Sequence, residues 1–278
     1  MKKRVILLVV ASFMMVFLLV SYTSWPIETP ISKYLTPRDE YTEKIEDMVC
    51  EVMKDLSELR MLVTPDSVDL KVVTTDWVRE NWGRRSAEAI IEEVKLEEEM
   101  YRVLFLISEN FSLVDLKVEQ AGTIMAAVAG NTLYVVREYF NPYDEENAKE
   151  LLAHELTHIL QGINFRVEEP SEFDGRQAKG ALIEGDADFT SRKYMLYRFN
   201  RSVEKSFTPP SGNETLRDID ALWCLWVFPY AYGFDFIEAL YNAGGWERVN
   251  EAYLNMPVST EQVMHPEKYL SGEGFALV

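Results

Sequence analysis

The sequence predicts a mainly helical α+β protein with a small mixed sheet. Long stretches carry apolar residues at helical spacing, and they cover residues 39–62, 86–107, 141–162, 176–198 and 216–243. Shorter stretches have the alternation or the residue types of strands, and they cover residues 68–72, 113–118, 124–129 and 132–136. Because the helical stretches are longer, helices should form most of the fold. No internal repeat divides the chain, so we expect one domain over residues 38–278.

The first elements follow one another closely. Apolar residues recur every three or four positions from Asp39 to Leu62, with acids and lysines between them, which predicts an amphipathic helix packed on a core. Val68 to Val72 alternate and predict a strand. Trp77 to Trp82 should form a short helical turn that closes at Gly83. Ser86 should then cap the next helix.

A hairpin is expected in the middle of the chain. Ile124 to Ala129 and Thr132 to Val136 are apolar arms around Gly130-Asn131, a two-residue turn of a type that favours hairpins. The alternating segment from Leu113 to Val118 should add another strand before it.

The helix after the hairpin has clear ends in the sequence. Asn141 is a good N-cap, and Pro142 suits the first helical position. Three acidic residues follow and favour the positive end of the helix dipole. Gly162 is a natural stop. The segment His154-Glu155-Leu156-Thr157-His158 therefore lies well inside a helix.

This segment has the H-E-x-x-H pattern. Positions four apart lie on one face of a helix, so His154 and His158 can reach the same metal ion. Glu155 lies about 100° round the helix and can face a water on that metal without ligating it. The spacing predicts half of a Zn²⁺ site, with Glu155 as the catalytic general base.

A catalytic zinc site normally has a third protein ligand. The chain contains only 3 histidines, so this ligand is His265 or a carboxylate. Glu184 and Asp188 lie one turn apart on one helical face. Glu184 can ligate the metal, and Asp188 can accept the free ring N–H of a ligating histidine. The alternative is a solvated acidic patch of Glu184, Asp186 and Asp188, which the apolar residues around them disfavour.

Small residues accompany these acids. They are Ala181, Gly185 and Ala187, and they would let this helix approach the H-E-x-x-H helix closely.

Together, the H-E-x-x-H segment and Glu184-x-x-x-Asp188 resemble the gluzincin branch of the zincin metallopeptidases, of which thermolysin is the familiar member. The resemblance covers roughly residues 120–190. It implies a zincin-like fold, with the sheet over the active-site helix, and zinc-dependent peptide hydrolysis. It also implies that an edge strand before that helix binds the substrate in extended form. Either Ile124 to Ala129 or Thr132 to Val136 would hold this edge.

The expected mechanism follows from these roles. Zinc acidifies its bound water, and Glu155 accepts the proton as that water attacks the scissile carbonyl. The oxyanion needs a further donor. The resemblance implies a histidine or tyrosine from the C-terminal part, so His265 is the catalytic candidate. Tyr230 and Tyr232 are alternatives, although packing in the core is the simpler role for tyrosines in such an aromatic stretch.

The N-terminus predicts export. A basic leader, Met1 to Arg4, precedes an apolar run from Val5 to Val20, so residues 1–22 read as a signal-anchor helix or a cleaved signal peptide. No good cleavage site follows, which favours the anchor. Residues 23–37 contain three prolines and should form a linker. We expect a single-pass cell-membrane protein with its catalytic domain outside the cytoplasm, or a secreted protein if the segment is cleaved.

Charge narrows the possible partners. The net charge is −18 and no basic stripe is visible, which argues against a nucleic-acid partner. A peptide or protein substrate is expected, with membrane contact through residues 1–22. Two other functions stay open: a zincin-shaped binding module without peptidase activity, and a zinc hydrolase of non-protein envelope material. Glu155 argues against the first, because a structural zinc needs no general base.

Overall fold

The computed structural model describes residues 39–203 and 218–274. They group into two compact units, each assembled from separate stretches of the chain. The described parts of the first unit are residues 39–42, 69–141 and 218–226, and those of the second are residues 43–68, 142–203 and 227–274. Neither unit is continuous along the chain. No single linker therefore marks a boundary between them within residues 38–278.

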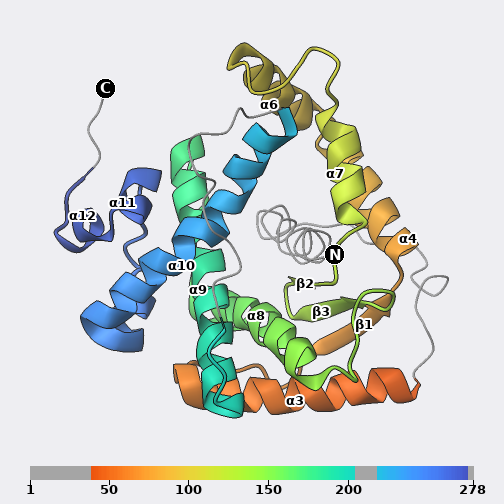
Figure 1. The fold of residues 1–278 in the computed structure, drawn as a ribbon, viewed down its shortest axis with the longest axis vertical. Coiled ribbons are helices and arrows are strands. Elements are labelled where there is room, and N and C mark those ends of the chain that lie inside the picture. Colours follow the sequence, from red (N-terminus) through yellow and green to blue (C-terminus); the bar gives the residue numbers. More distant parts are fainter. Residues whose placement is uncertain (1–38, 204–217, 275–278) are drawn as a thin grey trace. The chain divides into compact units, whose positions relative to one another are not determined.

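The first unit holds a three-stranded sheet of β1 (Asp69–Val73), β2 (Ala126–Ala129) and β3 (Thr132–Val136), in the order β1-β3-β2 (Figure 1). β2 and β3 are the predicted antiparallel hairpin, and β1 pairs with β3 in parallel. The turn places Gly130 at φ 61°, in the left-handed region that glycine favours. The mainly helical α+β class with a small mixed sheet is therefore confirmed, whereas the zincin-like arrangement stays a prediction.

The strand order also bears on the predicted substrate strand. β3 pairs with β1 on one side and with β2 on the other, so it is the central strand of the described sheet. Of the two candidate segments, only the one that contains β2 lies at an edge.

The segment predicted as a strand at 113–118 is instead helix α7 (Leu113–Ala121), so that prediction is wrong. The Ser112 side chain accepts a hydrogen bond from the Asp115 amide and caps the helix. Leu113 and Ala121 are both fully buried, and their separation of eight positions suits one face of a helix. The cap and this burial outweigh the local alternation.

The structure from Trp77 to Trp82 also differs from the predicted short helical turn. It continues without a stop from α4 (Thr75–Val78) through the π-helix η2 (Arg79–Arg85) into α5 (Ser86–Ala89). The helical turns therefore continue past Gly83. Glycine suits this position because it lies against α7, where a Cβ would come within 3.1 Å of the Val118 Cα. Ser86 has helical backbone angles, and its hydroxyl donates to the Asn81 carbonyl at 2.9 Å instead of accepting from a helix N-terminus. The break before α6 (Ile91–Val103) falls at Ile90.

An aromatic cluster forms part of the core of the first unit. The rings of Trp77 and Tyr134 stack at a centroid distance of 5.4 Å. Trp82 meets both rings edge-on, at 5.3 Å and 5.0 Å. Tyr134 belongs to β3, so these contacts fasten the α4–η2 turn to the central strand.

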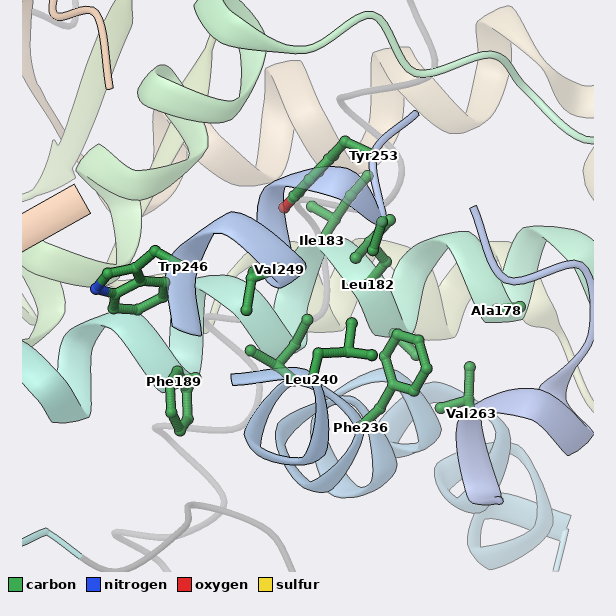
Figure 2. Packing of buried hydrophobic residues seen from close by; sticks show 13 residues of the cluster. Ala178, Leu182, Ile183, Phe189, Phe236, Leu240, Trp246, Val249, Tyr253 and Val263 are labelled. Atoms are coloured by element: carbon green, nitrogen blue, oxygen red, sulfur yellow. The ribbon is translucent and has the colours of Figure 1, made fainter. Parts of the chain in front are cut away.

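The second unit is helical. It contains most of α3 (Glu40–Arg60), α8 (Glu145–Asn164), α9 (Phe173–Phe199), the C-terminal part of α10 (Asp218–Glu251), α11 (Thr260–Met264) and α12 (Pro266–Leu270). α8 and α9 pack side by side (Figure 1). Figure 2 shows the core in which Leu182 and Phe189 of α9 lie beside Phe236 and Leu240 of α10. This apolar contact fixes α10 against α9.

Helix α8 starts and ends later than predicted. It begins at Glu145, and its N-cap residue is Asp144 rather than Asn141. Gly162 lies inside the helix, which runs on to Asn164. The extension is held by the Asn164 side chain, which accepts a hydrogen bond from the Val63 amide at 2.9 Å and donates one to the Val63 carbonyl at 2.8 Å.

Helix α10 is longer than the stretch 216–243 that the sequence predicts as helical, since it runs on to Glu251. It continues through Pro229 and Gly233, and its non-helical residues are Gly244 and Gly245. Gly245 has φ 67°, which explains why glycine suits this kink.

The predicted single-pass membrane topology is wrong for the part of the chain that the structure describes. Within residues 39–203 and 218–274, no helix is both long enough and apolar enough to cross a bilayer. The predicted anchor and linker, residues 1–37, lie outside the described residues.

Candidate metal centre

Three of the predicted ligands meet in the second unit. α8 presents His154 and His158 one turn apart, with their ring planes at 79° and their centroids 4.9 Å apart. Glu184 comes from α9, which packs alongside α8. All three side chains are buried, and together they could hold one metal ion.

The three donor atoms, His154 Nε2, His158 Nε2 and Glu184 Oε2, lie at the corners of a nearly equilateral triangle. The two histidine Nε2 atoms are 3.2 Å apart. Glu184 Oε2 lies 3.4 Å from His154 Nε2 and 3.5 Å from His158 Nε2. Tetrahedral zinc with bonds of about 2.0–2.2 Å separates its nitrogen and oxygen ligands by about 3.3–3.6 Å. The triangle is therefore close to the ligand spacing of a zinc-sized cation held by three protein ligands.

The charges of the cluster also favour a cation. Burial disfavours the carboxylate of Glu184, but the two histidines outweigh burial and lower its pKa to about 2. Burial likewise disfavours charge on His158, yet Glu184 and Glu155 raise its pKa to about 9. Burial lowers the pKa of His154 to about 4. A buried carboxylate thus holds a positive charge beside it, which is the environment that a metal ion needs.

Glu155, in the H-E-x-x-H segment, is a second buried carboxylate beside Glu184. It is 0% exposed, and neither of its oxygens accepts a hydrogen bond within the described residues. Burial raises its pKa to about 8. A buried carboxyl group that accepts no hydrogen bond destabilises a structure by roughly 1–3 kcal/mol. Its position beside the two histidines suits a group that receives and returns protons.

The free ring nitrogen of His158 has a partner that the sequence did not suggest. His158 Nδ1 lies 2.8 Å from Gln161 Oε1. Gln161 follows three residues later on the same helix, so the spacing itself was the available signal. The prediction assigned this kind of contact to Asp188.

Asp188 is also buried, and its Oδ1 lies 3.3 Å from Arg192 Nη2. Arg192 in turn donates to Glu150 Oε1 on α8 at 2.9 Å. Asp188 as an acceptor for the ring of His154 stays a prediction. The alternative of a solvated acidic patch is excluded, because Glu184, Asp186 and Asp188 are all buried.

Helices α8 and α9 do pack together, but Gly185, one of the three small residues of α9, lies against α10. A Cβ on Gly185 would lie 2.3 Å from the carbonyl carbon of Gly233, and a Cβ on Gly233 would lie 2.3 Å from the Ala181 oxygen. Gly185 therefore lets α10, rather than α8, approach α9 backbone to backbone.

This approach brings Tyr230, one turn before Gly233, to the metal centre. Its side chain is buried, and its hydroxyl is close enough to Glu184 and Glu155 for their charges to act on it. Burial raises its pKa well above the ordinary value, and the negative charges of Glu184 and Glu155 raise it further. Tyr230 therefore carries its proton at neutral pH and is a hydrogen-bond donor. Packing was the simpler expectation for this residue, but the structure also places it close to two carboxylates.

His265 is placed differently from the other site candidates. It lies between α11 and α12, its side chain is 52% exposed, and its Nδ1 is 3.5 Å from Glu267 Oε1. The buried group that could hold a metal consists of His154, His158 and Glu184 and does not include it. Its predicted catalytic role finds no support in these contacts.

Comparison with known proteins adds little to this description. No known protein-family model matches the chain, and no curated protein matches it. The chain is similar to a crystal structure of a candidate hydrolase with a novel fold from Chloroflexus aurantiacus. The alignment covers 95% of this chain and 98% of that chain, with 18% sequence identity and a TM-score of 0.49. The chemistry of the site must therefore come from the residues of this chain.

Proposed function

We propose that this protein is a zinc-dependent hydrolase that cleaves peptide bonds. The observation that carries the proposal is the buried triangle of His154 Nε2, His158 Nε2 and Glu184 Oε2, with side lengths of 3.2, 3.4 and 3.5 Å. Two histidines with one carboxylate are an attested ligand set of catalytic zinc sites. When bound, zinc would supply Lewis acidity and an acidified water.

Glu155 is the proposed proton carrier. Its carboxylate is buried next to the ligands and accepts no hydrogen bond within the described residues, so its lone pairs are available to an attacking water. A base in this place takes a proton from the water and returns it to the leaving amine. A structural metal site would gain nothing from such a residue.

Tyr230 is the proposed donor to the developing oxyanion, in place of His265. It is protonated and buried, and the charge of Glu184 acts on its hydroxyl. A preorganised donor in a water-poor site stabilises the charge that appears on the carbonyl oxygen during attack.

A peptide is the proposed substrate for two reasons. The H-E-x-x-H and Glu184-x-x-x-Asp188 patterns resemble those of gluzincin peptidases, and an acidified water attacking a carbonyl is the chemistry of peptide hydrolysis. The location of the protein in the cell is not part of the proposal.

The test is hydrolysis of a mixed peptide library by the full-length chain, with zinc and with a chelator. Zinc-dependent cleavage that Glu155→Gln abolishes, while zinc stays bound, would support the proposal. The matched control is Glu146→Gln, which alters an exposed carboxylate on the same helix and should cleave like the wild type. Equal cleavage by Glu155→Gln would overturn the mechanism.

The same experiment separates the alternatives. A protein that binds zinc and cleaves neither peptides nor ester and glycan probes would be a binding module. Zinc-dependent cleavage of the non-peptide probes alone would keep the metal centre and change the substrate class.

A further inference from the structure

The amide of Gln161 has only one possible orientation. Its Nε2 donates to the carbonyl of Ile183 at 2.9 Å and to Asp186 Oδ2 at 3.1 Å. A backbone carbonyl and a carboxylate can only accept, so both amide hydrogens are committed to α9. The Gln161 Oε1 must therefore be the atom that faces His158.

This orientation fixes the tautomer of His158. Gln161 Oε1 can only accept, so the His158 Nδ1 at 2.8 Å must carry the proton. The lone pair of a neutral imidazole with this proton is on Nε2. That nitrogen is the one that points to His154 Nε2 and Glu184 Oε2.

Asp186 is what holds the amide in place. Its Oδ2 accepts from Gln161 and also from the Tyr253 hydroxyl, at 2.7 Å. Its Oδ1 pairs with Arg60 Nη1 at 2.6 Å, and both side chains are 0% exposed. A neutral amide at this position could offer its own N–H to Gln161, whereas a carboxylate cannot.

Arg60, the ion-pair partner of Asp186, makes further contacts within the second unit. It donates to Thr190 Oγ1 at 2.7 Å and to Asn250 Oδ1 at 2.9 Å. Its guanidinium lies 4.2 Å from the ring centroid of Trp246. Trp246 and Tyr253 belong to the core seen in Figure 2, so the network is anchored in the hydrophobic core of the second unit.

We infer that Asp186 and Arg60 are positioning residues for the metal centre, acting through Gln161 to hold the tautomer and the ring orientation of His158. The contacts run in one line from Arg60 to Asp186, Gln161 and His158, and each has an unambiguous donor. The inference rests on the metal site of the proposed function, but it does not depend on which bond the protein cleaves.

The experiment measures zinc affinity by chelator competition, the visible spectrum of the cobalt-substituted protein, and the stability of the metal-free protein. Gln161→Met removes the acceptor, and Asp186→Asn replaces one of the two acceptors that orient the Gln161 amide by a group that can also donate to its oxygen. Both should weaken zinc binding by about 10–100-fold, as is usual for partners of metal-ligating histidines, and both should alter the cobalt spectrum.

Two further variants separate positioning from packing. Gln161→Glu still presents an oxygen to His158, so zinc affinity should hold even though stability falls, because a second carboxylate then faces Asp186. Combining it with Asp186→Asn should restore the affinity that Asp186→Asn alone loses, because the new amide can donate to the new carboxylate. Lys149→Met is the matched control, since it removes a buried lysine of α8 that pairs with Glu51 and Glu145, without touching the network.

Several results would overturn the inference: zinc affinity unchanged in Asp186→Asn, no rescue by the double variant, or a loss in Lys149→Met as large as in Asp186→Asn. A wild-type protein that bound neither zinc nor cobalt would instead defeat the metal-dependent function itself. The two failures are therefore distinguishable.

Discussion

Gly185 and Gly233 bring α9 and α10 into backbone contact beside the metal centre, since a Cβ on Gly185 would come within 2.3 Å of the Gly233 carbonyl carbon. Gly185 directly follows the predicted ligand Glu184, and Tyr230 lies one turn before Gly233. The distance between the two helices therefore also sets the distance from the Tyr230 hydroxyl to the Glu184 carboxylate.

Gly185→Ala should destabilise the protein by at least the 1–3 kcal/mol that is usual for overpacking, because backbone atoms, unlike a flexible side chain, cannot move aside cheaply. Denaturant unfolding measures this change. Gly162→Ala is the control: a Cβ at Gly162 meets nothing within 4 Å, and the position is inside α8. It should stabilise the protein by about 0.5–1 kcal/mol. Equal effects at both positions would contradict the close approach.

Glu184→Gln should weaken zinc binding more than the roughly 10–100-fold expected for a residue that only supports a ligand. The neutral amide keeps the size of the side chain but removes the charge that balances the cation. Isothermal titration with zinc measures the effect. Glu150→Gln is the control, since Glu150 is a partly buried carboxylate that pairs with Arg192 and not with either histidine. If Glu184→Gln binds zinc like the wild type, Glu184 is not a ligand.

Tyr230→Phe should lower kcat about 100- to 1,000-fold, the usual cost of losing one oxyanion donor, while zinc affinity changes far less. Steady-state kinetics on a cleaved peptide, together with zinc titration, separate the two quantities. His265→Gln should leave kcat unchanged, because His265 is half exposed and contacts Glu267. The reverse pattern would restore His265 as the catalytic residue.

Zinc should stabilise the folded protein, because its three ligands converge only in the packed second unit. At a free concentration of 100 times Kd, the free energy of unfolding should rise by about 2.7 kcal/mol. Denaturation curves with zinc and with chelator measure this difference. Magnesium prefers oxygen ligands in an octahedral arrangement, so it should not substitute for zinc. Curves that coincide with and without zinc would contradict binding to the native site.

The local parts of the site could be predicted from the sequence. His154, His158 and Glu155 follow from helical spacing, and Glu184 follows from the need for a third ligand on a neighbouring helix. The first inference involves residues within one helical turn. The second uses one requirement of zinc chemistry, which is a third protein ligand. The Gly130-Asn131 hairpin was predictable for the same reason, since its turn is local.

The long-range parts could not be predicted. Arg60 lies 126 positions from Asp186 in the chain, and Tyr253 lies 67 positions from it. A basic residue at the end of an amphipathic helix reads as solvated until the fold shows what surrounds it. The strand prediction at Leu113 was wrong because the Ser112 cap and packing against η2 favour a helix there over a strand. The interleaved units left no linker in the sequence to mark them.

The buried pair of Arg60 and Asp186 leads to the last prediction. Both side chains are 0% exposed, and their atoms are 2.6 Å apart. Arg60→Met should therefore cost about 3–5 kcal/mol of unfolding free energy, because it leaves an unpaired carboxylate in the core. Denaturant titration of the metal-free protein measures this without any contribution from zinc.

The control for this change is Lys95→Met, which breaks an ion pair with Glu92 whose side chains are 62% and 82% exposed. Such surface pairs contribute about 0–1 kcal/mol, so this variant should unfold close to the wild type. The double change Arg60→Met with Asp186→Leu should recover much of the stability, because no charge is then left unpaired in the core. It should not recover zinc affinity, since Gln161 has then lost the carboxylate that orients it. Stability and metal binding returning together would mean that the network only packs the core.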